Sequence, residues 1–239
     1  MVSAGGLGYR LGSGRDILAE IDFTLSPGSF LAVVGENGAG KTTLLDLLMG
    51  FRRRARGSLS VLGQDPDTDP WQARSRIAYL SEKIDMPGDW VVADFLGFHR
   101  RFYRSYDRDE ERTLMGRLGL RSDTRLGTMS AGENRRVQIV AGLAARPELL
   151  IADEITAVLD ILGRRLFLAL LKERQQTMGL TTVLATNVPE GLDPYADHVL
   201  VISRGRQVAF SRIASYVPDG GSLADAIADT LTTHARALP

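Results

Sequence analysis

Residues 35–42 read Gly-Glu-Asn-Gly-Ala-Gly-Lys-Thr and fit the pattern G-x-x-x-x-G-K-[ST] at every fixed position. The preceding run, Phe30 to Val34, is short and apolar, as is typical of a buried parallel strand. Lys41 to Met49 follow with the leucine spacing of a helix. A glycine loop between such a strand and helix turns backbone N–H groups inward and adds the positive helix end, and both features bind phosphate. The stretch therefore predicts an α/β unit that binds a nucleoside triphosphate.

Each residue type in this loop has a chemical role. The Lys41 ammonium is expected to reach the β- and γ-phosphates, and the Thr42 hydroxyl is expected to ligate Mg²⁺. The residues expected to contact the nucleotide from this loop are Asn37, Gly38, Ala39, Gly40, Lys41, Thr42 and Thr43.

A second acidic motif follows about 110 residues later. Leu149 to Ala152 form an apolar strand that ends in Asp153 and Glu154. Asp153 is suited to hold Mg²⁺ through its carboxylate, while Glu154 can polarise a water for in-line attack on the γ-phosphorus. The alternative is an acidic strand end that faces solvent.

Strand-like and helix-like segments alternate along the chain, which predicts an α/β fold with a mostly parallel sheet and helices on both faces. The further strands are expected at 17–25, 77–80, 182–185 and 199–202, with a hairpin-like turn at Gly205. Helices are expected at 161–176 and 222–231, the latter followed by a loose tail. Helical spacing dominates residues 83–147, so we expect a helical lobe inserted between sheet elements.

Composition limits the classes of function. The formal net charge is zero, which gives no electrostatic argument for nucleic acid as a partner. The chain has no cysteine, which excludes disulfides and thiolate sites, and its three histidines lie far apart. No run approaches the roughly 18 apolar residues of a membrane span, and residues 1–14 are glycine-rich without the apolar stretch of a signal peptide. A cytoplasmic location is therefore expected.

Six segments, taken in order, resemble the ATP-binding subunit of ABC transporters over almost the whole chain. They are an adenine-stacking aromatic at Tyr9, a Walker A loop at 35–43, a Q-loop at 78–82, a signature at Met129 to Glu133, a Walker B strand at 151–154 and a D-loop at 157–160. The resemblance implies a P-loop NTPase core (1–82 and 147–210) with an antiparallel N-terminal β subdomain. It also implies a helical lobe with the signature (83–146) and a short tail (211–239), together forming one nucleotide-binding domain over 1–239.

The chain departs from the family pattern at four places. Glu82 stands where glutamine is usual, and its carboxylate can still ligate Mg²⁺ or position water. The signature carries Ala131 and Glu133 in place of glycine and glutamine, and Ile155 replaces a proline. Asn187 stands where the switch histidine belongs; asparagine donates a hydrogen bond but carries no positive charge.

The resemblance also implies a mechanism. Two subunits would pair head to tail around Mg-ATP, with Ser130, Gly132 and Glu133 of one capping the nucleotide of the other. The second subunit is a copy of this chain or a paralogue. The pair would drive a separately encoded permease from the cytoplasmic face of the membrane. The stretch at 102–107 resembles export-type (ABC-2-like) subunits, as does the short segment after the last strand.

Two points stay open at the level of sequence. The lobe aromatics Trp90, Phe95, Phe98, Phe102 and Tyr103 are expected mainly in the core of the lobe, with a subset available to receive a membrane partner. Because Asn187 replaces histidine, an ATP-gated module with weak or no hydrolysis is the alternative function. A non-transport ABC protein and a P-loop kinase or GTPase fit less well, since the chain lacks a second cassette, a coiled-coil insertion and a guanine motif.

Overall fold

One nine-stranded sheet runs through the protein, which we describe from a computed structural model covering residues 2–157 and 159–237. The strands follow the order β4-β1-β2-β9-β8-β3-β7-β6-β5 across the sheet. Their bounds are β1 Val2–Arg10, β2 Asp16–Leu25, β3 Phe30–Val34, β4 Arg56–Val61, β5 Ile77–Ser81, β6 Leu149–Asp153, β7 Thr181–Thr186, β8 His198–Ser203 and β9 Arg206–Arg212. The helices are α1 Lys41–Leu48, α2 Pro70–Arg74, α3 Val92–His99, α4 Arg108–Arg117, α5 Ala131–Ala144, α6 Ile161–Met178, α7 Ile213–Tyr216 and α8 Leu223–Ala237.

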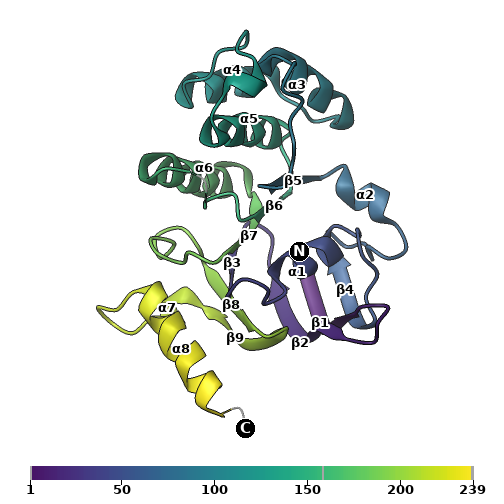
Figure 1. Ribbon diagram of the computed structural model, residues 1–239, viewed down its shortest axis with the longest axis vertical. Helices are drawn as coiled ribbons and strands as arrows, with labels where there is room; N and C mark the ends of the chain where they lie inside the picture. The colour runs from purple at the N-terminus through teal and green to yellow at the C-terminus, as the bar shows by residue number, and fades with distance from the viewer. Residues whose placement is uncertain (1, 158, 238–239) are drawn as a thin grey trace.

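The central strands β8, β3, β7, β6 and β5 are mutually parallel and buried on both faces. Successive side chains of β3 enter different clusters, because Phe30 and Ala32 pack with the helical lobe and Leu31 packs with α1. This alternation explains why the run 30–34 is apolar throughout rather than at every second position. Helices therefore cover both faces of the sheet, as the sequence predicts (Figure 1).

The N-terminal part of the sheet is antiparallel. Strand β1 pairs with both β2 and β4, and these three strands form the subdomain beside α1 (Figure 1). Strand β2 then joins the rest of the sheet through a parallel pairing of Ala19 with Arg206 of β9. The antiparallel subdomain implied by the family resemblance is thus confirmed.

The helical lobe consists of α3, α4 and α5 and stands at one end of the molecule (Figure 1). Within the described residues, the segment 83–146 contains no strand, only an isolated bridge between Val91 and Arg125. Helix α5 packs against β5 and its apolar face joins the main core cluster, so the lobe and the sheet share one core.

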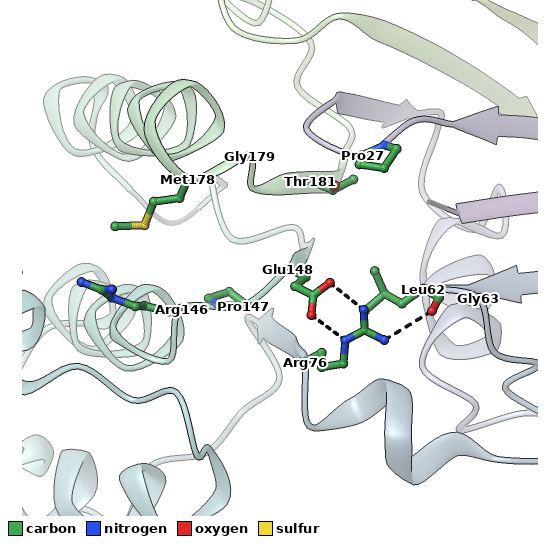
Figure 2. A pocket seen from close by; sticks show the side chains of 10 residues that line it. All are labelled: Pro27, Leu62, Gly63, Arg76, Arg146, Pro147, Glu148, Met178, Gly179 and Thr181. Carbon is green, nitrogen blue, oxygen red and sulfur yellow. Dashed lines mark hydrogen bonds and ion pairs between the residues drawn. The ribbon is translucent and has the colours of Figure 1, made fainter.

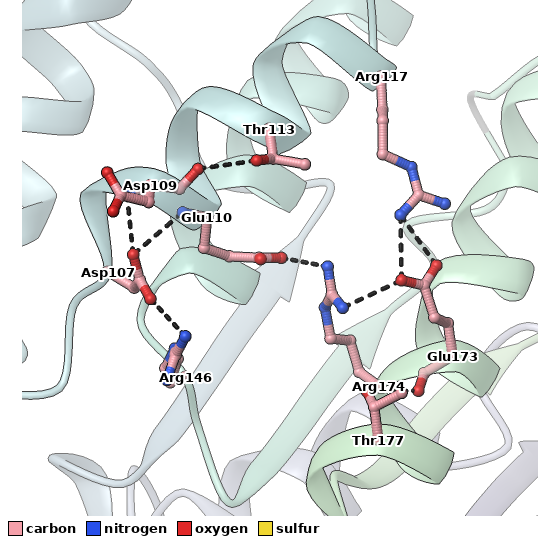
Figure 3. Close-up of polar contacts among 9 residues, drawn as sticks. All are labelled: Asp107, Asp109, Glu110, Thr113, Arg117, Arg146, Glu173, Arg174 and Thr177. Carbon is pink, nitrogen blue, oxygen red and sulfur yellow. Dashed lines mark hydrogen bonds and ion pairs between the residues drawn. The ribbon is translucent and has the colours of Figure 1, made fainter.

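A network of charged side chains attaches α4 to α6 (Figure 3). Arg174 of α6, whose side chain is 9% exposed, binds Glu110 of α4 and also Glu173 at 3.1 Å. Arg117 of α4 reaches the same Glu173 at 2.9 Å. Because the Arg174 guanidinium is buried, loss of both carboxylate partners would leave an uncompensated charge, whereas loss of one leaves the other in place.

The structure differs from the sequence predictions in four elements. Strands β1, β4 and β9 were not predicted as separate elements. The prediction of a loose tail after 231 is wrong through Ala237, because α8 continues to that residue. Helix α8 is an amphipathic surface helix, which buries Leu223 and Ile227 and exposes polar residues. Residues 238–239 lie outside the described part of the chain.

Candidate functional site

The carboxyl ends of three parallel strands bring the candidate site together. Strand β3 ends at Val34, opposite Thr186 of β7, and Asp153 of β6 lies opposite Ala185 of β7. Three segments therefore lie at the same edge of the sheet: the phosphate loop, the pair Asp153 and Glu154, and residue 187. In open α/β sheets this edge is where ligands bind.

The phosphate loop folds closely over its neighbours, and two glycines make this possible. A Cβ on Gly35 would lie 2.2 Å from the Ile202 carbonyl oxygen, so no other residue fits there. Gly40 has φ of 107° and precedes α1 directly, with Leu18 against the space that a side chain would need. Glycine adopts positive φ at little steric cost, so these two residues permit the tight course of the loop.

Lys41 lies inside this loop and is 5% exposed. Its Nζ donates to the carbonyl oxygens of Gly35 at 2.7 Å and Glu36 at 3.1 Å. It also forms an ion pair with Glu154, whose Oε1 lies 3.1 Å away. The ammonium is thus held where phosphate oxygens would sit, with the Glu154 carboxylate as its anionic partner.

Thr42 and Asp153 form the candidate magnesium site. The Thr42 hydroxyl lies 2.9 Å from Asp153 Oδ2 and 3.2 Å from Oδ1. Two adjacent oxygen ligands of an octahedral Mg²⁺ with bonds of about 2.0–2.1 Å stand about 2.9 Å apart, so this pair fits the ion. Burial raises the pKa of Asp153, the Thr42 hydrogen bond opposes that rise, and a bound cation would act in the same direction as the hydrogen bond.

Glu154 turns away from the direction of Asp153 because its backbone is left-handed, with φ of 53°. Such a conformation costs about 1 kcal/mol for a residue with a Cβ. One carboxylate oxygen faces Lys41, and the other accepts the backbone N–H of Asn187 at 3.2 Å. The Asn187 side chain in turn donates to Asn37 Oδ1 at 3.1 Å. The residues expected to position water and γ-phosphate are therefore in mutual contact.

Glu82 follows directly after β5 and is exposed. Its backbone N–H donates to the Asp153 carbonyl at 3.4 Å, which places it at the edge of the site. Arg135 of α5 binds the carbonyl oxygens of Ser81 (3.0 Å) and Glu82, so the lobe helix holds this loop by its backbone. The Glu82 carboxylate favours the charged form of Arg135, whose pKa is lowered by burial.

The signature residues lie apart from the phosphate loop. Ser130 caps α5, its hydroxyl and N–H both donate to the Glu133 carboxylate at 2.8 Å, and the Glu133 N–H donates back at 3.2 Å. Among the described contacts, no hydrogen bond joins Ser130, Gly132 or Glu133 to residues 35–43 of the same chain. Of the predicted D-loop, Asp160 caps α6 and Val158 lies outside the described residues.

Tyr9 contacts Arg52, and its stacking on adenine stays a prediction. Its hydroxyl accepts from Arg52 Nη1 at 3.0 Å, and the Arg52 guanidinium lies 5.3 Å from the ring centroid. Arg52 is itself held by Asp46 at 2.7 Å. One face of the ring is thus occupied by a cation, and an adenine on Tyr9 would use the other face or displace Arg52. Thr43, the last of the loop residues, is the third residue of α1.

A hollow of 610 Å³ opens at the opposite end of the parallel strands (Figure 2). It is crossed by the Arg76–Glu148 pair, in which two N–H groups bind the two carboxylate oxygens at 2.6 Å each. Arg76 and Glu148 precede β5 and β6, whereas the phosphate loop follows β3. The hollow is therefore separate from the candidate nucleotide site.

Sequence reasoning missed four contacts of the site. The pattern Ser-x-x-Glu at 130–133 is the signal of a capping box, which explains Glu133 without reference to nucleotide. The Lys41–Glu154 pair joins two motifs that were assigned separate tasks. The backbone contacts of Arg135 and Arg164 have no sequence signal, because a carbonyl acceptor is present at every residue.

The chain is similar to known ATP-binding proteins. Residues 18–157 match the family model described as ABC transporter. The chain is 30% identical over 231 residues to the methionine import ATP-binding protein MetN 1 of Rhodococcus jostii, covering 92% of this chain and 68% of that protein. It is 28% identical over 207 residues to the Nod factor export ATP-binding protein I of Rhizobium leguminosarum bv. viciae, covering 83% of this chain.

The match spans 65% of the length of that Nod factor export protein. A solved structure of the ATP-binding subunit of an ABC transporter superposes with a TM-score of 0.86 at 23% identity, covering 97% of this chain and 99% of the other. At that identity the superposition establishes a shared fold.

Proposed function

Since the chain belongs to the ABC transporter family of ATP-binding proteins, we propose that it binds and hydrolyses Mg-ATP to drive a separate membrane permease. The observation that carries the proposal is the convergence of Lys41, the Thr42–Asp153 pair and Glu154 at one sheet edge. Phosphoryl transfer to water requires a cation that binds phosphate, a pair of oxygen ligands for Mg²⁺ and a carboxylate that orients the water.

Each residue of the site has its own role in the proposed hydrolysis. Lys41 holds the β- and γ-phosphates once the incoming phosphate replaces Glu154 as its anionic partner. Glu154, released from that ion pair, orients the attacking water and accepts its proton. Asn187 contacts both Glu154 and Asn37 and is placed to donate a hydrogen bond to the γ-phosphate. Magnesium, held by Thr42 and Asp153, would neutralise charge on the phosphate oxygens.

The head-to-tail pair is part of the proposal. Ser130 and Gly132 stand at the exposed N-terminal end of α5, a position that favours anions. Because they make no hydrogen bond to the phosphate loop of their own chain in the described structure, a second subunit is the natural source of the ligand they would cap. Ile161 and Leu162, which are 74% and 76% exposed beside the D-loop, favour burial in such an interface.

The permease is expected to dock where the helical lobe meets the core. Phe102 (60% exposed) and Trp71 (75% exposed) line a shared hollow of 610 Å³, and the rings of Trp90, Phe98 and Phe102 stack edge to face. Phe98 and Phe102 form the exposed subset of the lobe aromatics, whereas Trp90 and Phe95 pack against the core. No helix in the described part of the chain is long and apolar enough to span a membrane. We place the subunit on the cytoplasmic face of the membrane through this contact.

The proposed direction of transport is export. It rests on the similarity to the Nod factor export protein and on the stretch at 102–107, while the methionine import protein is similar to the same degree. Vesicles that contain this subunit and its permease decide the direction by the side on which substrate accumulates.

Steady-state release of phosphate from Mg-ATP tests the proposal. The wild-type protein should turn over well above Glu154→Gln, which keeps the shape of the side chain but cannot accept a proton. The matched control Glu148→Gln removes an exposed carboxylate that binds Arg76 at the opposite end of the parallel strands, and should equal wild type. Wild-type turnover equal to Glu154→Gln would contradict hydrolysis by this chain.

The alternative is an ATP-gated module with weak or no hydrolysis. Asn187 favours it, because an amide cannot supply the positive charge of an imidazolium. In that case ATP would still bind with normal affinity and pair the subunits, while phosphate release would stay at the level of Glu154→Gln.

A further inference from the structure

Arg164 lies one turn into α6 and contacts the loop that carries Asn187. Its Nη2 donates to the carbonyl oxygens of Val188 and Glu190, both at 2.6 Å. Val188 follows Asn187 directly, so the arginine binds the loop at the residue next to the one that faces Glu154. Both N–H groups of Nη2 are used, and they bridge two carbonyls of one short turn.

The position of this arginine is determined by the start of α6. Asp160 accepts the N–H of Gly163 at 2.6 Å and its carbonyl accepts the N–H of Arg164 at 2.8 Å. The helix therefore begins at a fixed residue, and the Arg164 side chain leaves it toward the 187–190 loop. Arg165, the next residue, points outward and is exposed.

The contact between Arg164 and the loop is stronger than an exposed surface contact. The Nε of Arg164 is buried and has no hydrogen-bond partner in the described structure, which is a cost that only strong bonds at Nη2 offset. Bonds from a guanidinium to carbonyl oxygens are charge-assisted, and the planar group fixes the direction of both. These bonds therefore restrict the motion of both the Arg164 side chain and the loop.

The opposite side of the loop carries the chemistry. The Asn187 N–H binds Glu154 at 3.2 Å, its side chain binds Asn37 at 3.1 Å, and the Val188 N–H binds the Thr186 hydroxyl at 3.0 Å. None of these contacts anchors the segment beyond Val188. The loop is anchored again at Leu192, which is fully buried and whose N–H donates to the Pro189 carbonyl at 3.2 Å. Between these two anchors, Arg164 supplies the described hydrogen bonds from α6 to the segment 188–190, so its loss would loosen the residues next to Asn187.

We propose that Arg164 is a positioning residue that holds the 187–190 loop so that Asn187 keeps its place against Glu154. The inference rests on the proposed ATP hydrolysis but concerns how this chain fixes one loop of the site. Misplacement of a reacting group by about 1 Å can lower a rate by about a hundredfold. The effect is therefore expected in kcat, since Lys41 and the phosphate loop do not touch Arg164.

Phosphate release should be measured for wild type, Arg164→Met, Arg164→Lys and the matched control Arg165→Met. Arg164→Met should lower kcat by about tenfold or more with KM changed less than about threefold. Arg164→Lys, which can reach one carbonyl but lacks the fork, should lie between. Arg165→Met should match wild type. Equal kcat in Arg164→Met and Arg165→Met would overturn the proposal.

A double-mutant cycle separates positioning from general stability. If Arg164 acts through Asn187, then Arg164→Met should change kcat by less than about twofold when Asn187 is already alanine. Full multiplication of the two losses would show that Arg164 acts by another route and would overturn the proposal.

Hydrogen exchange measures how often the loop opens and does not require ATP hydrolysis. In the nucleotide-free protein, Arg164→Met should speed exchange of the amides at 187 and 188 by about tenfold or more, while Arg165→Met leaves them unchanged. Unchanged exchange in Arg164→Met would refute the positioning role even if the protein hydrolyses ATP. Faster exchange in a protein that never hydrolyses ATP would support the positioning role and contradict the proposed function instead.

Discussion

An asparagine at position 187 preserves the hydrogen-bond donor of the site and removes the proton acceptor. Its side-chain amide donates to Asn37, and its backbone N–H binds Glu154. The residue is exposed, so the neighbouring space can accommodate a larger ring. The contacts of the loop therefore do not depend on a histidine, whereas the electrostatics of the γ-phosphate do.

Asn187→His should accordingly raise the turnover of Mg-ATP several-fold. An imidazole adds a partial positive charge next to the γ-phosphate and keeps an N–H donor for the same contact. Phosphate release at saturating ATP measures the change, with the melting temperature as a control for folding. An unchanged kcat would mean that the charge at 187 does not limit the reaction.

At the scale of elements, the N-terminus of α5 is fixed by the reciprocal bonds of Ser130 and Glu133. Three hydrogen bonds join these residues, and the Ser130 contacts lower the pKa of Glu133. A carboxylate in the first turn also interacts favourably with the helix dipole. The family resemblance places a bound phosphate next to the Glu133 carboxylate. The negative charge of Glu133 therefore stabilises the helix but would repel that phosphate.

Glu133→Ala should lower the free energy of unfolding by about 1 kcal/mol, the usual cost of losing a capping partner. For a chain of this size that corresponds to a fall of about 2–4 °C in melting temperature. Glu133→Gln is the matched variant, because its amide oxygen can still accept from Ser130. It should be nearly as stable as wild type, and equal losses in both variants would point to charge rather than capping.

Helix α3 ends in an aromatic cluster around His99. The imidazole stacks on Phe95 and Tyr103, with ring centroids 6.2 and 4.9 Å away, and its Nδ1 has no partner in the described structure. Burial lowers the pKa of His99 to about 4 from its usual 6.5. The folded protein therefore resists protonation at this position, and the unfolded chain takes up the proton first.

The lobe should consequently lose stability in mild acid. Above pH 6.5 the neutral imidazole imposes no penalty; as the pH falls from 6.5 toward 4, the unfolded state binds one more proton and stability declines. The loss at pH 5 is about 1–2 kcal/mol. His99→Phe should flatten the decline in urea unfolding between pH 7 and 5. An identical slope in both proteins would assign the acid sensitivity to other groups.

The elements that were predicted from sequence are those with a strong local pattern. The apolar run 30–34 and the glycine loop after it determine β3, the phosphate loop and α1 almost to the residue. Strand β1 carries three glycines and β4 reads Arg-Gly-Ser-Leu-Ser-Val, so neither has the composition of a strand, and only pairing with each other and with β2 forms them. The backbone contacts of Arg164 depend on tertiary structure in the same way.

For the whole molecule, the two lobes are joined by contacts that reach the site. Arg135 of α5 binds the backbone at Ser81 and Glu82, while Arg174 of α6 binds Glu110 of α4. A rotation of the helical lobe would therefore move the Glu82 loop with it. If a membrane partner docks on the lobe as proposed, these contacts would couple its binding to the Glu82 loop of the site.

The proposed head-to-tail pair predicts an ATP-dependent dimer of the whole molecule. Glu154→Gln removes the negative charge that pairs with Lys41 and blocks proton acceptance, so ATP should both bind and persist. With Mg-ATP, this 26.1 kDa chain should elute from size exclusion at about twice its monomer mass, as light scattering can verify. With ADP it should remain a monomer, because the phosphate that Ser130 and Gly132 would cap is missing.

Adding Lys41→Ala to Glu154→Gln provides the decisive control. Lys41 is buried in the phosphate loop of its own chain and is far from the signature, so its loss should abolish pairing only if pairing depends on bound nucleotide. A dimer that persists in the double variant would not depend on bound nucleotide and would contradict the proposed ATP-dependent pairing. A monomer under saturating Mg-ATP, with ATP binding confirmed by calorimetry, would contradict the head-to-tail pair for this chain in isolation and would assign closure to the complex with the permease.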